Sequence, residues 1–222
     1  MLITSRQEHF SEIGKLALIA FPGHAIVFLL NLILARNLSV SEYENYVVAA
    51  SIYLLTLTVT SQGLDKYALR IMPGKFAKKQ NGLAAHYFRF AISRILIGAA
   101  IVSALTLFWA QELRDFPPQA LKAIYWSLFA LPLGALTYFL CAAISAAGNC
   151  VRAAAITQLI VPTLSLLLIG IALLSPISKS GATGIICWLI SWCLGLALAA
   201  IWLKRAWPAD ADNYGGKKIS IS

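Results

Sequence analysis

Six long stretches with almost no charge constrain this chain more than any other feature of the sequence. They cover residues 16–35, 46–64, 90–110, 123–143, 153–174 and 182–203. A helix needs about 20 apolar residues to cross the hydrocarbon core of a bilayer, and each stretch is that long. The second one contains a strand-like alternation at 56–60, but its length favours a helix. We therefore predict an all-α membrane protein, a bundle of six transmembrane helices.

The composition supports lipid as the solvent for most of the chain. Hydrophobic residues make up 59% of the 222 residues and charged residues only 12%, against about 25% charged residues in soluble domains. The net charge of +9 would fit a nucleic-acid partner only if the cations covered a polar surface. Here they lie in short gaps between apolar stretches. We expect no nucleic-acid partner, and intrinsic disorder and a disulfide-built fold are excluded too.

The positions of Lys and Arg predict how the helices cross the membrane. Fourteen of the 18 lie in the N-terminus, the second-to-third and fourth-to-fifth connections and the C-terminal tail. The other four are Arg36, Arg114, Lys122 and Lys179. Because cytoplasmic loops carry the excess of Lys and Arg, we expect a multi-pass protein of the cell inner (plasma) membrane with both termini in the cytoplasm.

The ends of the chain are expected to lie outside the bilayer. Residues 1–15 carry mixed charges and no cleavable signal peptide is apparent, so we predict a cytoplasmic N-terminal segment, as a short helix along the membrane surface. Residues 204–222 are polar and predict a cytoplasmic tail or a linker to a further lobe.

No group of residues in the sequence points to catalysis. All nine acids lie outside the uncharged cores of the stretches, and the three histidines lack metal-ligand spacing. The four cysteines form no CxxC pair, and no glycine-rich loop could cradle a phosphate. We expect no enzyme activity, no catalytic residue, no metal site and no cofactor.

Polar residues inside the stretches are the remaining functional candidates, because a polar group in hydrocarbon needs a partner or an aqueous cavity. His24 and Asn31 are seven residues apart and share one helix face. They indicate either a helix–helix contact or a cavity-lining stripe. Gln158 and Pro162 place a polar group beside a possible kink of the fifth helix.

Two arginines are open to two interpretations as well. Arg94 lies four residues into the third stretch, and Arg152 lies just before the fifth. Each could extend to the cytoplasmic headgroups, or form a cationic wall that meets an anionic substrate group.

Three segments together resemble a known family. Residues 32–46 contain Ala35-Arg36-Asn37-Leu38, followed by Tyr43 and Tyr46. They resemble the turn between the first two helices of polysaccharide-transporter flippases, although Asn45 replaces the usual small residue. Gln62-Gly63-Leu64-Asp65 is similar to the end of that family's second helix. The run from Gly148 to Arg152, with Gln158 and Pro162, resembles the start of its fifth helix.

This resemblance implies a fold and a function. The flippases belong to the multidrug, oligosaccharidyl-lipid and polysaccharide exporter superfamily, whose members have two six-helix lobes around a central cavity. The resemblance covers one lobe, residues 1 to about 203, so the chain is expected to be an N-terminal half that acts with a second six-helix lobe or a homodimer partner. The implied function is flipping of a polyprenyl-pyrophosphate-linked oligosaccharide for surface polysaccharide, O-antigen or lipopolysaccharide assembly.

Within that function, the candidate residues take specific roles. Arg94 and Arg152 would hold the pyrophosphate, while His24, Asn31 and Gln158 would hydrogen-bond sugar hydroxyls and membrane lipids would surround the carrier tail. A cation-coupled multidrug exporter half is an alternative, but it needs an intramembrane carboxylate, which these stretches lack. A non-transporting membrane subunit is a further alternative.

Overall fold

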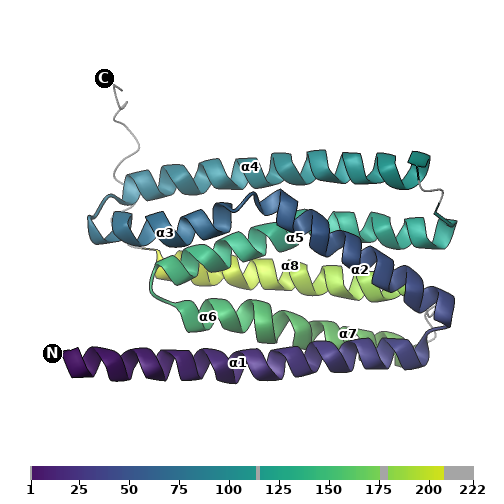
Figure 1. Cartoon of the computed structure of the whole chain (residues 1–222), viewed down its shortest axis with the longest axis horizontal. Coiled ribbons are helices and arrows are strands. Elements are labelled where there is room, and N and C mark those ends of the chain that lie inside the picture. The colour runs from purple at the N-terminus through teal and green to yellow at the C-terminus, as the bar shows by residue number, and fades with distance from the viewer. Residues whose placement is uncertain (1, 114–115, 176–179, 208–222) are drawn as a thin grey trace.

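The chain folds into a bundle of helices (Figure 1). The computed structural model describes residues 2–113, 116–175 and 180–207, with side chains from residue 14 onward except that of residue 113. No strand occurs in these ranges. The elements in chain order are α1 (Leu2–Asn37), α2 (Val40–Ser61), α3 (Leu64–Ala77), α4 (Asn81–Phe108), η1 (Trp109–Leu113), α5 (Pro118–Ala146), α6 (Cys150–Ala154), η2 (Ala155–Ile160), α7 (Val161–Leu174) and α8 (Gly181–Ala206), where η1 and η2 are π-helical turns.

Five helical segments of the described chain are long and apolar enough to cross a membrane. They are Gly14–Asn37, Asn81–Glu112, Pro118–Ala146, Cys150–Leu174 and Gly181–Ala206. A sixth is reached only if α2 and α3, which are bent by 42° at their junction, count as one span. The predicted membrane-helix bundle is thus confirmed at the level of an all-helical chain with five or six such helices.

Several helix boundaries differ from the sequence-based prediction. Residues 2–15 are the start of α1, so no separate helix precedes the first span. The span predicted to begin at residue 90 is α4, which begins at Asn81. The span predicted to end at residue 64 is α2, which ends at Ser61. Counts of apolar residues detect only the part of a helix suited to lipid, whereas backbone hydrogen bonds continue into charged flanks. The tail was predicted to begin at residue 204, but residues 204–206 form the last turn of α8. Its part from residue 208 onward lies outside the described residues.

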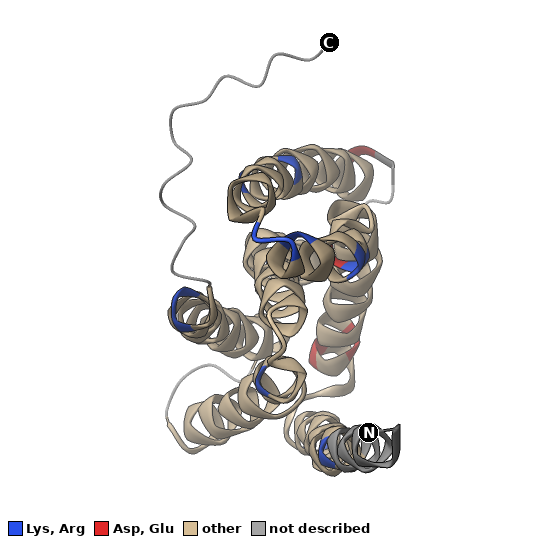
Figure 2. Ribbon diagram, turned by 90° about the vertical axis from the view of Figure 1, so that its left-hand side faces the viewer, with Lys and Arg blue, Asp and Glu red and all other residues tan. Residues whose placement is uncertain are grey.

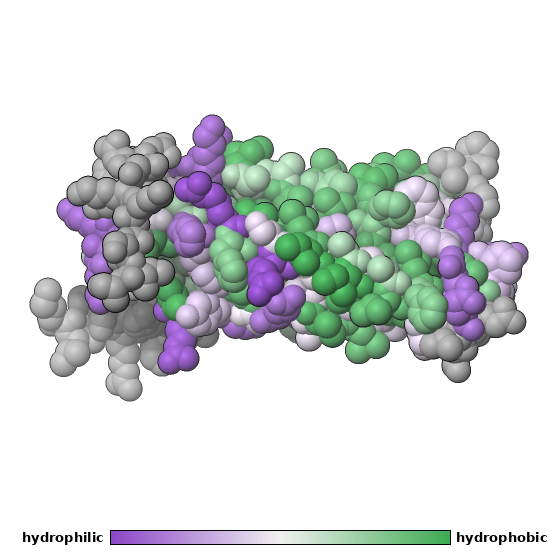
Figure 3. Space-filling model, turned by 90° about the horizontal axis from the view of Figure 1, so that it is seen from above, coloured by the Kyte–Doolittle hydropathy of each residue, from purple (hydrophilic) through white to green (hydrophobic). Residues whose placement is uncertain are grey.

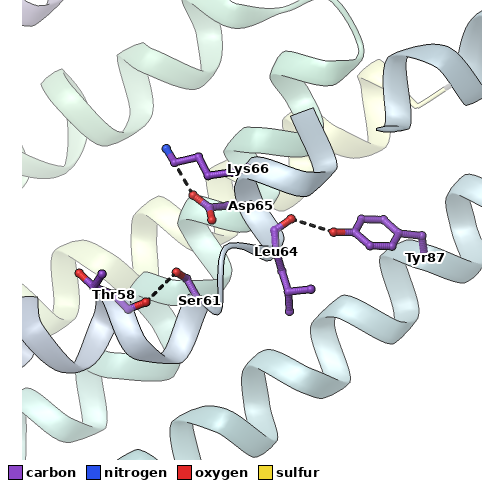
Figure 4. Close-up of polar contacts among 6 residues, drawn as sticks. All are labelled: Thr58, Ser61, Leu64, Asp65, Lys66 and Tyr87. Atoms are coloured by element: carbon purple, nitrogen blue, oxygen red, sulfur yellow. Dashed lines mark hydrogen bonds and ion pairs between the residues drawn. The ribbon is translucent and has the colours of Figure 1, made fainter. Parts of the chain in front are cut away.

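The junction of α2 and α3 is an interruption of the helix that specific residues stabilise. Gln62 and Gly63 both adopt left-handed conformations, with φ of 48° and 71°, and glycine reaches this region without the steric cost of a Cβ. The Tyr87 hydroxyl on α4 donates to the Leu64 carbonyl at 2.8 Å (Figure 4). Ser61 Oγ bonds the Thr58 carbonyl at 3.1 Å on the other side of the break. The two helices are therefore each held at the ends that face the break.

Helix α5 is the centre of the bundle and α1 its most peripheral member. Of the 18 residues that form the most apolar stretch of α5, 72% are buried, against 11% in α1. Helix α5 packs against α2, α3, α4, α6 and α8, whereas α1 rests mainly on α7 and η2. Small residues such as Ala130, Gly134 and Ala142 line α5, and small residues let membrane helices approach closely.

One end of the bundle is tied by a side chain from the first turn of α2. Ser39 Oγ caps α2 by accepting from the Glu42 amide at 3.3 Å. The Glu42 carboxylate in turn accepts from the Gly181 amide at 2.7 Å, at the first residue of α8. A carboxylate at a helix N-terminus satisfies a free N–H and interacts favourably with the helix dipole. Glu42 therefore joins the starts of two helices that lie far apart in sequence.

Charge is distributed unevenly between the two ends. Lys and Arg gather at the end that holds the start of α1, the α3–α4 turn and the end of α8 (Figures 1 and 2). Arg36 and Lys122 are the described cations of the other end, near the turns before α2 and at the start of α5. Apolar residues cover the middle of the molecule (Figure 3). An excess of Lys and Arg at one end of an apolar bundle is the pattern that the positive-inside rule describes.

Candidate functional site

A cleft of about 370 Å³ opens within the bundle. It is lined by residues of α1, α2, α5, η2, α7 and α8, so it brings together both halves of the chain. Its size falls in the range of about 300–1,000 Å³ that is typical of small-molecule sites. Helices α3 and α4 contribute no residue to it.

Tyr138, Trp188 and Trp192 form an aromatic wall of the cleft, and the fully buried Tyr53 packs against the two Trp rings without lining the cleft. The rings of Tyr53 and Trp188 meet edge to face, with centroids 4.4 Å apart, and Trp188 lies 6.1 Å from Trp192. Tyr138 of α5 contacts Trp192 at 5.4 Å. Because Trp188 and Trp192 are four residues apart on α8, they share one face. Edge-to-face pairs of this kind stabilise the wall and fix the ring planes.

Neutral polar groups lie on the remaining sides. Asn31 Nδ2 donates to the Val27 carbonyl of its own helix at 2.9 Å, and Thr157 and Ser165 likewise bond carbonyls of their own helices. Trp192 Nε1 is buried without a hydrogen-bond partner in the described structure. Among the residues that the structure describes, no charged side chain lines the cleft. The site can therefore exchange hydrogen bonds with a ligand but cannot neutralise a charge.

Helix α1 is positioned at the cleft by its contact with η2. Pro162 has no N–H to give to the Gln158 carbonyl four residues earlier, and the chain before it widens into a π-type turn in which the Val161 amide bonds the Ile156 carbonyl. The Gln158 carbonyl then lies against Gly23, where a Cβ would overlap it. Glycine at this place lets α1 approach closely enough to place Asn31, two turns further on, in the cleft.

The structure does not bring the five predicted site residues together. Asn31 lines the cleft. Gln158 is next to the lining residue Thr157, and its Oε1 is buried without a described partner. His24 is exposed on α1, with Nδ1 2.7 Å from the Ala20 carbonyl.

Neither arginine lies at the cleft. Arg94 is exposed on α4, with its guanidinium 5.5 Å from the centroid of the Phe90 ring. Arg152 is exposed on the short helix α6. Since neither α4 nor α6 lines the cleft, the expected arrangement of cations beside sugar-binding groups is not formed within this part of the chain.

The aromatic wall was not predicted as a site. Tyr46 and Tyr53 are seven residues apart and Trp188 and Trp192 four apart, so each pair marks a helix face. This spacing could have identified the faces. It could not have shown that they meet, because that depends on how α2 and α8 pack around α5.

A second cleft, of about 320 Å³, lies between α4 and α5. Its lining is almost entirely apolar, with Leu96, Leu107, Phe129 and Pro132 among the residues. Such a surface suits a hydrocarbon chain and offers few groups for specific recognition. The cleft beside α1 is therefore the better candidate for a functional site.

Comparison with known proteins identifies no relative: no protein-family model, no curated protein and no solved structure matches the chain.

Proposed function

We propose that this chain is a membrane-embedded transporter lobe that flips a lipid-linked oligosaccharide. The observation that carries the proposal is the neutral, aromatic-walled cleft in the middle of an apolar bundle. Sugar hydroxyls both donate and accept hydrogen bonds, and sugar rings present apolar C–H faces. A site with aromatic faces and a few fixed polar groups matches this chemistry.

The absence of charge from the cleft bears on the alternative of a cation-coupled exporter. Coupling to a cation needs a titratable group inside the membrane. Within the described chain, the cleft has Asn31 where such a group would be useful, and an amide does not titrate. A neutral polar ligand is therefore favoured over a coupling ion.

The peripheral position of α1 supports a role for this helix as the moving element of the transporter. Elements that move during function are drawn from those with few buried contacts, and α1 is the least buried of the candidate spans. We propose that α1 shifts against η2 and α7 to open and close the cleft, with a second lobe, from another chain or another copy, completing the pathway.

Asn31 and Asn37 provide a matched test of the cleft. Both donate from Nδ2 to the carbonyl four residues earlier, at 2.9 Å in each case, but only Asn31 lines the cleft. Loss of one ligand hydrogen bond costs about 1 kcal/mol, or about fivefold in affinity. We expect Asn31→Ala to weaken binding of a polyprenyl-pyrophosphate-linked oligosaccharide by about that factor, and Asn37→Ala to leave it unchanged.

The measurement is native mass spectrometry of the full chain in nanodiscs, with polyprenyl pyrophosphate as the ligand that lacks only the glycan. Trp188→Ala serves as a second cleft variant and Trp202→Ala, on the same helix but outside the cleft, as its control. If the wild-type chain retains both ligands equally, the cleft does not recognise the glycan and the proposal is wrong. Expression of the chain in a flippase-deficient bacterial strain then tests whether it transports without a second lobe.

A further inference from the structure

A basic helical hairpin stands apart from the cleft. It consists of α3 and the first part of α4, residues 81–94, and we call it the α3–α4 hairpin. Between residues 64 and 94 the only acid is Asp65, which lies 3.5 Å from Lys66 in an ion pair. The other cations have no ion pair within the described structure. They are Arg70, Lys75, Lys78, Lys79, Arg89 and Arg94.

The length of α4 places this hairpin at the membrane surface. The segment Asn81–Glu112 has 32 residues, which corresponds to about 48 Å of helix, whereas the hydrocarbon core is about 30 Å thick. The 18 residues from Ile95 to Glu112 span about 27 Å and account for the crossing. The turns before Arg94 therefore lie at the level of the headgroups or beyond.

The break between α2 and α3 lies near the same level. Gln62 Nε2 packs over Gly98, where an added Cβ would lie 3.0 Å from it. Gly98 is one helical turn from Arg94 on α4, so the α2–α3 break is close to the first headgroup-level cation. Left-handed residues are tolerated there, because water and headgroups can satisfy backbone groups that hydrocarbon cannot.

The side chains of the hairpin are divided between core and surroundings. Ala68, Met72, Ala84 and Ala91 are buried against the bundle. Arg70, Arg89 and Arg94 are exposed. Arg89 and Arg94 are five residues apart, which puts them on different sides of α4. Exposed cations on different sides of one helix can each contact a separate lipid headgroup.

Exposed aromatic rings accompany these cations. Tyr67 is 51% exposed and Phe90 is 48% exposed, and the Arg94 guanidinium lies over the Phe90 ring. Aromatic rings beside long basic side chains are characteristic of the bilayer interface, where the ring meets the acyl boundary and the cation reaches the phosphate. Hydrophilic residues reach inward from the end of the molecule that carries the hairpin (Figure 3).

We propose that the α3–α4 hairpin binds anionic phospholipid headgroups as an annular surface. Its exposed cations contact the phosphates of several neighbouring lipids at once, and its apolar side chains anchor it to the bundle. This inference does not depend on the transported substrate. It assigns the hairpin a partner that the cleft does not use.

The experiment compares two double variants of the full chain in nanodiscs of phosphatidylcholine mixed with the anionic lipid phosphatidylglycerol. One variant is Arg89→Gln with Arg94→Gln, and the matched control, at the opposite end, is Arg36→Gln with Lys122→Gln. Native mass spectrometry counts the co-purified phosphatidylglycerol. Each cation near an anionic surface contributes about fivefold to lipid affinity, so we expect the first variant to lose about tenfold or more of its phosphatidylglycerol preference. We expect the control to lose much less, because Glu42 and Glu44 lie at the same end as Arg36 and Lys122 and repel anionic lipid.

Two further measurements distinguish an annular lipid surface from a single anion pocket. We expect the wild-type chain to retain several anionic lipids, and raised salt to reduce their number gradually. An equal loss in the control variant, or no loss in either, overturns the proposal. Displacement by millimolar inorganic pyrophosphate of a single, tightly held lipid would show a converging anion pocket instead. Unfolding temperatures in pure phosphatidylcholine, expected to be equal for all variants, exclude misfolding as the cause.

Discussion

Tyr53 and Gly134 show how single residues hold the aromatic wall in place. Tyr53 is fully buried, and its hydroxyl has no hydrogen-bond partner within the described residues. The ring fits only because Gly134 on α5 has no side chain, since an added Cβ would overlap the Tyr53 hydroxyl. The position of the Trp188 and Trp192 rings depends on this fit, because both contact Tyr53.

We therefore expect Gly134→Ala to destabilise the protein by about 1–3 kcal/mol, the usual cost of overpacking a core. Tyr53→Phe removes a hydroxyl without a described partner, so it should be nearly neutral alone and should recover much of the stability lost in Gly134→Ala. Thermal unfolding of the detergent-solubilised chain measures both effects. Gly170→Ala is the control, because nothing lies within 4 Å of a Cβ at that site. Independent, additive effects of the two substitutions would contradict the predicted overlap.

At this scale the sequence predicted part of the candidate site. Asn31 was identifiable because an amide in an apolar stretch requires a partner or a cavity. For Arg94 and Arg152 the sequence leaves two interpretations open, a headgroup contact or a substrate contact, because position along a helix does not define which neighbour the side chain faces. Tyr53 and Trp188 were missed because aromatic residues are common in apolar helices. Only the packing around α5 shows that these two rings meet.

At the scale of helices, the contact of α1 with η2 determines whether the cleft exists. Helix α1 has few buried residues, and its close approach depends on Gly23 lying against the Gln158 carbonyl. The widened turn before Pro162 presents that carbonyl. A proline in one helix and a glycine in another thus form one docking contact.

Substitution of Gly23 should loosen this helix selectively. A Cβ at residue 23 would overlap the Gln158 carbonyl, and a backbone atom cannot turn aside as a flexible side chain can. We expect Gly23→Ala to raise hydrogen–deuterium exchange in α1 and to leave α5 and α8 unchanged. Gly14→Ala, on the same helix with open space around it, should not raise exchange. Equal exchange in both variants would show that the Gly23 contact does not hold α1.

The helices themselves were largely predictable, and the exceptions have a physical cause. Long apolar runs specify spanning helices because lipid leaves the backbone no other partner. The resemblance places a helix end at Gln62–Asp65, but not a break between two helices, because the break depends on left-handed conformations and on the Tyr87 contact rather than on hydropathy. Helix α3 was treated as a connection, since its amphipathic, basic sequence resembles a loop when only apolar residues are counted.

At the scale of the whole molecule, charge separates the two ends of the bundle. The α3–α4 hairpin and the end of α8 bring Lys and Arg to one end, while Glu42 and Glu44 lie at the start of α2 at the other. Cations near the ends of spans resist translocation and stay in the cytoplasm. We infer that the end with the hairpin is cytoplasmic.

A native cysteine tests this orientation. Cys150 is exposed at the turn between α5 and α6, at the end that carries the hairpin, and Cys141 and Cys187 are buried. Cys193 is exposed on α8 and is replaced by Ala to leave Cys150 as the main reporter. A membrane-impermeant maleimide should then label Cys150 in inside-out vesicles and not in intact cells. The matched variant, Ser39→Cys with Cys150 and Cys193 replaced by Ala, should show the opposite result, because Ser39 lies in the turn before α2. Labelling of Cys150 in intact cells would place the basic end outside and would overturn both the orientation and the cytoplasmic location of the α3–α4 hairpin.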